Sequence, residues 1–392
     1  MFNGCYARRR VFVTGHTGFK GAWLTAWLLD LGAEVTGFSR DIPTTPAAFS
    51  ELGLERHIRH LTGDVRDREA LARAMAGTRP EMVFHLAAQS LVRPSYEDPG
   101  LTFETNALGT LNLLEAVRRA PEVRAVVCVT SDKCYRNDEW VFGYRETDPL
   151  GGKDPYSASK ACAELVARAY FSSFFRDGPA MATARAGNVI GGGDWARDRI
   201  IPDCARAWAQ DAPAVIRNPG ATRPWQHVLE PLSGYLWLGA RLLQDAPPEE
   251  AAPPGGAAPP GGAAPRRSAD PAFGSGLKAD KEAFNFGPGA EVAATVSEVV
   301  SALGPYWPGF RASLEQAGES RESTLLKLCC DKALAALGWR AALSFAETIR
   351  LTAEWYRIYY SGKGGADMRA VSSGQIAVYA AKAAEKGLPW TR

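Results

Sequence analysis

The sequence VFVTGHTGFKG, from Val11 to Gly21, decides the fold of this chain. Its first three residues are an apolar run typical of a strand, and the residues after Gly21, AWLTAWLLDLG, are compatible with a helix. A strand, a glycine turn and a helix are typical of a dinucleotide site, because glycines let the backbone approach a pyrophosphate at a helix N-terminus. The spacing is Gly15-x-x-Gly18-x-x-Gly21, not the commoner G-x-G-x-x-G. A tight turn without a ligand is the alternative, and the flanking strand and helix favour the dinucleotide site.

Composition excludes several other classes of protein. The 392 residues carry 45 Lys and Arg against 43 Asp and Glu, so we expect no nucleic-acid partner and no membrane surface. No apolar run is long enough to span a bilayer, and the N-terminal residues are a poor signal peptide. The seven cysteines show no metal-type spacing, so we expect no metal site and a reducing, cytoplasmic location.

The strand and helix pattern of residues 11–32 recurs along the chain. It predicts an α/β protein with a Rossmann-type doubly wound parallel sheet and a smaller C-terminal substrate-binding lobe. A long amphipathic helix is expected over residues 101–120. The further strands are expected at residues 34–40, 57–64, 82–87, 123–129 and 180–190.

The length of the chain suggests more than one structural unit. We expect a dinucleotide-binding domain over residues 1–190. Residues 191–392 are expected to form mainly the substrate-binding lobe, with some segments returning to the first domain. Residues 246–276 repeat the unit PPGGAA and contain few apolar side chains, so they predict a flexible surface insertion.

The end of the second strand bears on the choice of cofactor. Rossmann sites usually place an acidic residue there, whereas this chain has Ser39 and Arg40. An arginine could accept a 2′-phosphate, which favours NADP or tolerance of both cofactors. Alternatively, Arg40 stacks on adenine or is solvated. Asp64, after the third strand, could accept a hydrogen bond from the adenine amino group or cap the following helix.

The remaining predicted cofactor contacts come from the glycine turn and from two other strand ends. His85 lies inside an apolar strand and is expected to be a core residue. The additional cofactor-binding residues are Gly15, Thr17, Gly18, Phe19, Lys20, Gly21, Val65, Leu86, Ala87 and Ala88.

Candidate catalytic residues follow the fifth strand and begin a later helix. Ser131, Asp132 and Lys133 stand where doubly wound sheets place ligands. In DPYSASK, Asp154 and Pro155 predict a helix start. Tyr156 and Lys160, four residues apart, then share one helix face. A nearby ammonium would lower the pKa of the tyrosine and make it a base for a sugar or alcohol hydroxyl. Such a pair is common on ordinary helices, and the preceding glycine turn is what gives it weight.

A second polar stretch lies in the later half of the chain. Arg223-Pro224-Trp225-Gln226-His227 places a cation beside an aromatic ring and an amide, which suits a nucleoside diphosphate. A surface turn with a packed Trp is the alternative.

Together these motifs resemble the extended short-chain dehydrogenase/reductase superfamily, and within it the CDP-glucose 4,6-dehydratase family. The similarity covers about residues 10–240, with a weaker match near residues 337–354. Its more specific stretches are ARAGNVIGGGDW and RPWQHV; the others are GHTGFKG, TSDKCY, DPYSASK and DRIIPD.

The resemblance implies a dehydratase with bound NAD. Tyr156 would take the proton of the glucose 4-hydroxyl, Lys160 would hold the cofactor ribose, and Ser131 would bond the same hydroxyl. Asp132 would protonate the leaving 6-hydroxyl. Lys133, where related dTDP-sugar dehydratases are expected to have Glu, would be the C5 base or else a structural partner of Asp132.

The resemblance also implies a nucleotide-sugar substrate and a homodimer formed through a four-helix bundle of the helices at 101–120 and 155–175. A sequence departure, Arg321-Glu322-Ser323 in place of His-Glu-Ala, puts substrate contacts there in doubt. Another sugar-nucleotide dehydratase or epimerase, or a cofactor-sensing protein, is the alternative. The expected substrate-binding residues are Gln89, Ser90, Asn106, Asn188, Arg199, Ile201, Arg217, Arg223, Gln226 and Asn285.

Overall fold

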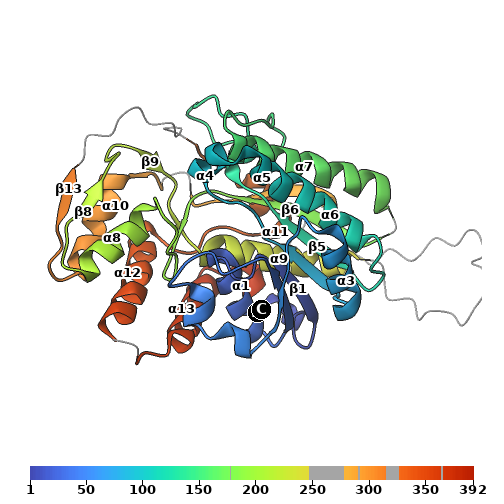
Figure 1. Cartoon of the computed structure of the whole chain (residues 1–392), viewed down its shortest axis with the longest axis horizontal. Helices are drawn as coiled ribbons and strands as arrows, with labels where there is room; N and C mark the ends of the chain where they lie inside the picture. The colour runs from blue at the N-terminus through green and yellow to red at the C-terminus, as the bar shows by residue number, and fades with distance from the viewer. Residues whose placement is uncertain (177, 247–277, 290–291, 315–325, 363–364) are drawn as a thin grey trace, which may run out of the picture.

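The computed structural model describes residues 1–176, 178–246, 278–289, 292–314, 326–362 and 365–392. A seven-stranded sheet in the order β11-β6-β5-β4-β1-β2-β3 runs through it, and all of its strand pairs are parallel (Figure 1). The predicted doubly wound parallel sheet is confirmed. Its strands are β1 (Arg10–Thr14), β2 (Glu34–Ser39), β3 (Arg59–Thr62), β4 (Met82–His85), β5 (Ala125–Val129), β6 (Ala180–Ala186) and β11 (Glu282–Phe286).

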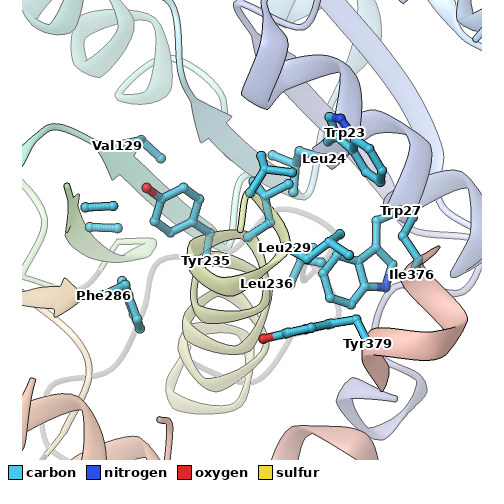
Figure 2. Close-up of a cluster of buried hydrophobic side chains, with 14 of the residues drawn as sticks. Trp23, Leu24, Trp27, Val129, Leu229, Tyr235, Leu236, Phe286, Ile376 and Tyr379 are labelled. Atoms are coloured by element: carbon cyan, nitrogen blue, oxygen red, sulfur yellow. The ribbon is translucent and has the colours of Figure 1, made fainter. Parts of the chain in front are cut away.

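Helices cover both faces of this sheet. The helices α3 (Arg68–Thr78), α6 (Gly109–Val117) and α7 (Pro155–Phe174) enclose one apolar cluster. On the other face lie α1 (Phe19–Asp30), α9 (Leu229–Asp245) and α13 (Met368–Glu385). Figure 2 shows Tyr235 of α9 beside Val129, the last residue of β5, and Leu236 on the side of Trp27 and Tyr379. The helix α9 therefore lies between the sheet and the C-terminal helix.

Two predicted elements are interrupted in the structure. The strand expected at 180–190 is two strands, because the chain leaves the main sheet after β6 and β7 (Val189–Ile190) pairs with β10 (Gln226–His227). The helix expected at 101–120 begins as α5 (Pro99–Phe103), passes through the π-helical turn η3 (Glu104–Leu108) and continues as α6. Both interruptions fall where polar residues of the site are found.

A smaller lobe lies beside the sheet domain (Figure 1). It contains α8 (Ile200–Ala209), α10 (Val296–Leu303) and α12 (Phe345–Ser361). Two small sheets complete it: β8 (Ala214–Ile216) with β13 (Ala312–Leu314), and β9 (Thr222–Arg223) with β12 (Ala294–Thr295). The elements α9 and β11 pack with the main sheet, and α13 packs against α1, although all three follow residue 190.

Three short helices fill connections: α2 (Ala48–Glu51), α4 (Val92–Glu97) and α11 (Asp331–Leu337). The chain ends meet, since the Asn3 backbone N–H donates to the carbonyl of Arg392 at 2.8 Å. Within the described ranges, no helix has the length and apolar character needed to cross a membrane. Of the insertion predicted at 246–276, all but Ala246 lies outside the described residues, as does Arg321-Glu322-Ser323.

Candidate active site

The glycine turn is packed too tightly for other residues. Gly15 has φ +73°, and a Cβ there would lie 2.6 Å from the backbone N of Ala87. A Cβ on Gly21 would lie 2.1 Å from the carbonyl oxygen of Gly15. The helix α1 that follows has Gly18 at its N-cap, no side-chain cap and no acidic residue in its first turn. Its N-terminal N–H groups and positive dipole end therefore suit a pyrophosphate.

Neutral side chains tie this turn to the neighbouring strands. His16 is buried, and its Nε2 lies 2.7 Å from Nδ1 of His60, while its Nδ1 lies 2.9 Å from Oγ of Ser39. Burial is the main cause that lowers the pKa of His16 to about 3, so the imidazole is neutral at physiological pH. The Thr17 hydroxyl donates to the carbonyl of Asp41 at 2.7 Å. His16 and His60 were not among the predicted site residues, and their 44-residue separation leaves no local pattern.

Charged groups surround the predicted adenosine end. Arg66 donates through Nη2 and Nε to Oδ2 of Asp64 at 2.7 and 3.0 Å. The helix cap is Asp67, which accepts from two backbone N–H groups of α3, so the alternative role of Asp64 as the cap is wrong. Arg40 pairs with Asp41 at 2.8 Å, and both side chains are exposed. The predicted residues Leu86, Ala87 and Ala88 follow the end of β4 and are half-buried.

The end of β5 carries a buried carboxyl group. The Ser131 hydroxyl donates to Oδ1 of Asp132 at 3.0 Å and accepts from the backbone N–H of Lys133 at 3.2 Å. Burial raises the pKa of Asp132, and the charge of Lys133 and the Ser131 hydrogen bond oppose it. The protonated form needed by a general acid is therefore favoured by the position of this group.

The helix α7 begins as predicted. Asp154 caps it by accepting from the backbone N–H of Ser157 at 2.9 Å, and Pro155 lies in the first turn. Tyr156 and Lys160 are both buried on the same face of the helix. Burial lowers the pKa of Lys160 to about 8.

The expectation that the pKa of Tyr156 is lowered is wrong. Burial outweighs every neighbouring charge and raises the pKa of Tyr156 to about 12. A hydrogen bond with Ser131 and the charge of Arg199 are what lower it. Arg199 is the N-cap residue of α8 and pairs with Asp194 at 2.7 Å. The cation that lowers the pKa of Tyr156 therefore comes from the smaller lobe.

Lys20 belongs to the same electrostatic cluster. Burial lowers the pKa of its ammonium to about 8, while the charge of Asp132 raises it and the charges of Arg199 and Lys160 lower it. Its Nζ lies 5.9 Å from the centre of the Tyr235 ring. The Tyr235 hydroxyl is buried and has no hydrogen-bond partner among the described residues, so it leaves a polar atom for a bound group. Tyr235 was not predicted, because nothing in α9 as a sequence distinguishes it from a core aromatic.

Three residues predicted to contact a substrate are bonded to the protein. Asn106, in the π-helical turn, donates to Oγ of Ser159 at 2.8 Å and accepts from the backbone N–H of Gln89 at 2.9 Å. Asn285 accepts from the Tyr135 hydroxyl at 2.8 Å and donates to two backbone carbonyls. Gln226 is buried and donates to the carbonyl of Phe286 at 3.1 Å. These bonds make Asn106 and Asn285 supports of the surrounding segments, whereas Oε1 of Gln226 is buried without a hydrogen-bond partner among the described residues.

A small, open hollow lies beside the end of β6 and next to Asp132. Its walls include Gly187, Pro224 and Lys327, and a Cβ at Gly187 would lie 3.0 Å from Oδ2 of Asp132. The predicted residues Asn188 and Arg223 are chain neighbours of this wall and are half-buried.

Other predicted residues lie at varied depth. Trp225 is buried and its indole N–H donates to Ala294 at 2.8 Å, so the stretch from Arg223 is not a surface turn. Ile201 is also buried. Ser90 is exposed, and Arg217 is exposed and pairs with Asp198 at 2.7 Å.

Comparison with known proteins agrees with this architecture. The sequence profile described as GDP-mannose 4,6 dehydratase matches residues 12–245. The chain belongs to the GDP-mannose 4,6 dehydratase family. It is 45% identical over 379 residues to a CDP-glucose 4,6-dehydratase of Salmonella typhimurium, and the match covers 95% of this chain and 96% of that protein.

Solved structures of similar fold include other sugar-nucleotide enzymes. A dTDP-glucose 4,6-dehydratase from Streptomyces venezuelae with NAD bound has a TM-score of 0.70 and 24% identity, over 90% of this chain and 98% of that chain. A UDP-glucose 4-epimerase from Thermus thermophilus in complex with NAD has a TM-score of 0.69 and 26% identity, over 89% of this chain and 99% of that chain. This member of the dehydratase family therefore shares its fold with dehydratases and epimerases.

Proposed function

We propose that this protein is a CDP-glucose 4,6-dehydratase, a hydro-lyase that converts CDP-D-glucose to CDP-4-dehydro-6-deoxy-D-glucose and water. The observation that carries the proposal is the buried carboxyl group of Asp132, hydrogen-bonded to Ser131 at 3.0 Å, in one electrostatic cluster with Tyr156. An oxidation at C4 requires a base, and a dehydration also requires an acid. The near full-length similarity to a CDP-glucose 4,6-dehydratase supports the choice of substrate.

We propose NAD as the cofactor. The features that fit a dinucleotide are the uncapped N-terminus of α1, the close-packed glycines and the Tyr235 hydroxyl, which has no hydrogen-bond partner in the part of the chain that the structure describes. Bound NAD would supply a reversible hydride acceptor, for the hydrogen of C4 and its later return to C6. Use of NADP would require a group that binds its 2′-phosphate, and Arg40 is the candidate for that role.

The oxidation half of the reaction is assigned to α7 and Ser131. Tyr156, as the phenolate, accepts the proton of the 4-hydroxyl when C4 becomes a ketone. Because burial raises the pKa of Tyr156, binding of the substrate and cofactor must favour the phenolate. The Ser131 hydroxyl orients the substrate hydroxyl, and Lys160 holds the cofactor ribose and adds positive charge.

The elimination half is assigned to Asp132 and Lys133. The 4-ketone acidifies C5–H, Lys133 accepts that proton, and Asp132 donates a proton to the 6-hydroxyl, which leaves as water. Lys133 then returns a proton, exchanged with solvent, to C5 as hydride is added to C6. Lys20 is a second candidate for the base, because burial lowers its pKa to about 8 and its charge is coupled to Asp132. A lysine must first lose its proton to act as a base.

Substrate binding is assigned to the junction of the two lobes. Asn188 and Arg223 are chain neighbours of residues that line the hollow at Gly187, and Arg199 lies in the electrostatic cluster with Tyr156; cations there suit the diphosphate. The remaining predicted substrate-binding residues stay part of the proposal and come from several elements: Gln89, Ser90, Asn106, Ile201, Arg217, Gln226 and Asn285.

We propose that residues 1–190 bind the cofactor and that the later residues mainly bind the substrate, with α9 and β11 returning to the sheet. We also propose a cytoplasmic homodimer. Leu108 is 51% exposed in the π-helical turn before α6, and Leu165 is 54% exposed on α7. These apolar side chains suit a four-helix interface between copies.

The test is incubation with CDP-glucose and NAD in D₂O. We expect a 4-keto-6-deoxy product that has lost one water and carries deuterium at C5. Mass spectrometry measures the loss of water, and NMR locates the deuterium. A 4-epimerase would leave C5 without deuterium. Absence of turnover on CDP-glucose, with turnover on another nucleotide hexose, would reject the substrate, and absence of turnover on all of them would reject the dehydratase.

A further inference from the structure

Glu164 is a buried charge on the catalytic helix that the reaction described above does not use. It lies four residues beyond Lys160 and eight beyond Tyr156, so all three share one face of α7. Only 3% of its surface is exposed. A carboxylate in such a position requires partners, because an unpaired buried charge is strongly destabilising.

Four donors satisfy this carboxylate. Oε1 accepts from the Thr130 hydroxyl and from Nε of Arg185 at 2.9 Å. Oε2 accepts from the Thr183 hydroxyl at 2.9 Å and from Nη2 of Arg185 at 2.8 Å. Each oxygen therefore receives one hydroxyl group and one guanidinium N–H.

The guanidinium continues the network away from the helix. Nη1 of Arg185 donates to the Tyr135 hydroxyl at 2.7 Å and to the carbonyl of Glu146 at 3.2 Å. The Tyr135 hydroxyl in turn donates to Asn285 at 2.8 Å. Buried ion pairs of this kind are often no more stabilising than apolar residues of similar volume, so stability alone is a weak reason for the arrangement.

The position of Thr130 supplies another reason. Thr130 follows the last residue of β5 and directly precedes Ser131, where the chain turns toward Asp132. Its backbone N–H is held by the carbonyl of Ala184 at 2.9 Å, and its hydroxyl is held by Glu164. The Glu164 carboxylate on α7 is therefore hydrogen-bonded to the end of β5, and the residues after β5 form the other half of the candidate active site.

We propose that Glu164 is a positioning residue, whose carboxylate joins the end of β5 to α7 and so keeps Ser131 in hydrogen-bonding register with Tyr156. The role rests on the proposed function. Glu164 touches neither substrate nor reacting atoms in this assignment. It acts through Thr130, and displacement of reacting groups by about 1 Å can cost about a hundredfold in rate.

The network provides a matched pair of variants. Thr130→Val and Thr183→Val each replace a buried hydroxyl with a methyl group and each remove one donor from the same carboxylate. Only Thr130 adjoins the catalytic segment. We expect Thr130→Val to lower kcat by about tenfold or more with KM for CDP-glucose within about twofold. We expect Thr183→Val to keep both constants within about twofold.

Hydrogen exchange gives a readout that needs no turnover. The backbone N–H groups of Lys133 and Cys134 bond Ser131, each at 3.2 Å. We expect both to exchange faster in Thr130→Val than in Thr183→Val or the native protein. Equal losses of kcat and of protection in the two variants, or no change in Thr130→Val, would overturn the positioning role. If the native protein does not convert CDP-glucose, the proposed function fails, and the exchange comparison alone decides whether Glu164 holds the segment.

Discussion

The two ends of the candidate site offer different chemical groups to a ligand. At the glycine turn, the surface offered to a ligand is mainly backbone: tightly packed glycines, the open N-terminus of α1 and the neutral imidazole of His16. At the ends of β5 and α7, the surface consists of buried ionisable groups, among them Asp132, Tyr156 and Lys160. In the proposed function, the first end recognises the shape and charge of the cofactor phosphates, and the second transfers protons.

This difference determines how each end responds to change. Backbone N–H groups do not titrate, so cofactor binding at the glycine turn should be insensitive to pH. It should also tolerate side-chain substitutions at positions other than the close-packed Gly15 and Gly21. Burial shifts the pKa values of Asp132, Tyr156 and Lys160, and each group depends on its neighbours. Changes at the proton-transfer end should therefore reduce turnover strongly while leaving cofactor affinity nearly unchanged.

The largest effect is expected for Tyr156→Phe. The variant loses the only atom assigned to accept the 4-hydroxyl proton, so kcat should fall by about a thousandfold. The dissociation constant for NAD, measured by calorimetry, should change by less than about threefold. Tyr96→Phe makes the same change on an exposed tyrosine and should leave kcat unaltered. Retained turnover in Tyr156→Phe would contradict the assignment of the base.

A somewhat smaller effect is expected for Asp132→Asn. The amide cannot protonate the leaving 6-hydroxyl, so product formation should slow by about a hundredfold, while reduction of NAD in a single turnover persists. Since burial raises the pKa of Asp132, the acid form is present below that raised pKa, and turnover by the native enzyme should fall as pH rises through it. Asp138→Asn, at an exposed position in the same connection, is the control. Loss of NAD reduction in Asp132→Asn would place Asp132 in the first step.

A third prediction, also at the proton-transfer end, distinguishes Lys133 from Lys20 as the base that removes the C5 proton. If Lys133 is the base, Lys133→Met should suppress deuterium incorporation at C5 by about a hundredfold, whereas Lys20→Met should mainly weaken binding, by about tenfold. Solvent exchange followed by NMR distinguishes the two variants, and each serves as the control for the other. Exchange retained in Lys133→Met and lost in Lys20→Met would transfer the role to Lys20.

Local patterns predict the glycine-turn end well. The strand, glycine turn and helix at residues 11–32 are contiguous, and each has its own local signal in residue type. The same holds for the start of α7, where Asp154 and Pro155 stand in sequence order at the helix cap. Such features need no information about distant contacts.

The proton-transfer end depends on distant pairs, and these have no local signal. As a sequence, Glu164 resembles any acidic residue on an amphipathic helix, and its partner Arg185 lies in a strand that follows the helix. The pKa of Tyr156 could not be predicted from the spacing to Lys160, because burial dominates it and Arg199 comes from another lobe. Likewise, β11 pairs with β6, a strand far from it in the sequence.

The smallest effect is expected for Arg40→Ala, which tests whether backbone groups supply most of the cofactor affinity at the glycine-turn end. Its pair with Asp41 is more than half exposed on both sides, and such pairs contribute about 0–1 kcal/mol. If NAD is the cofactor, Arg40→Ala should change its dissociation constant by less than about threefold, because backbone groups supply most of the binding. Arg56→Ala, at another exposed arginine, is the control. If the 2′-phosphate of NADP is recognised here, Arg40→Ala should instead weaken NADP about tenfold or more, since a charge-assisted hydrogen bond to phosphate is lost. That result would show that a side-chain charge, and not backbone N–H groups alone, determines cofactor affinity at the glycine-turn end of the site.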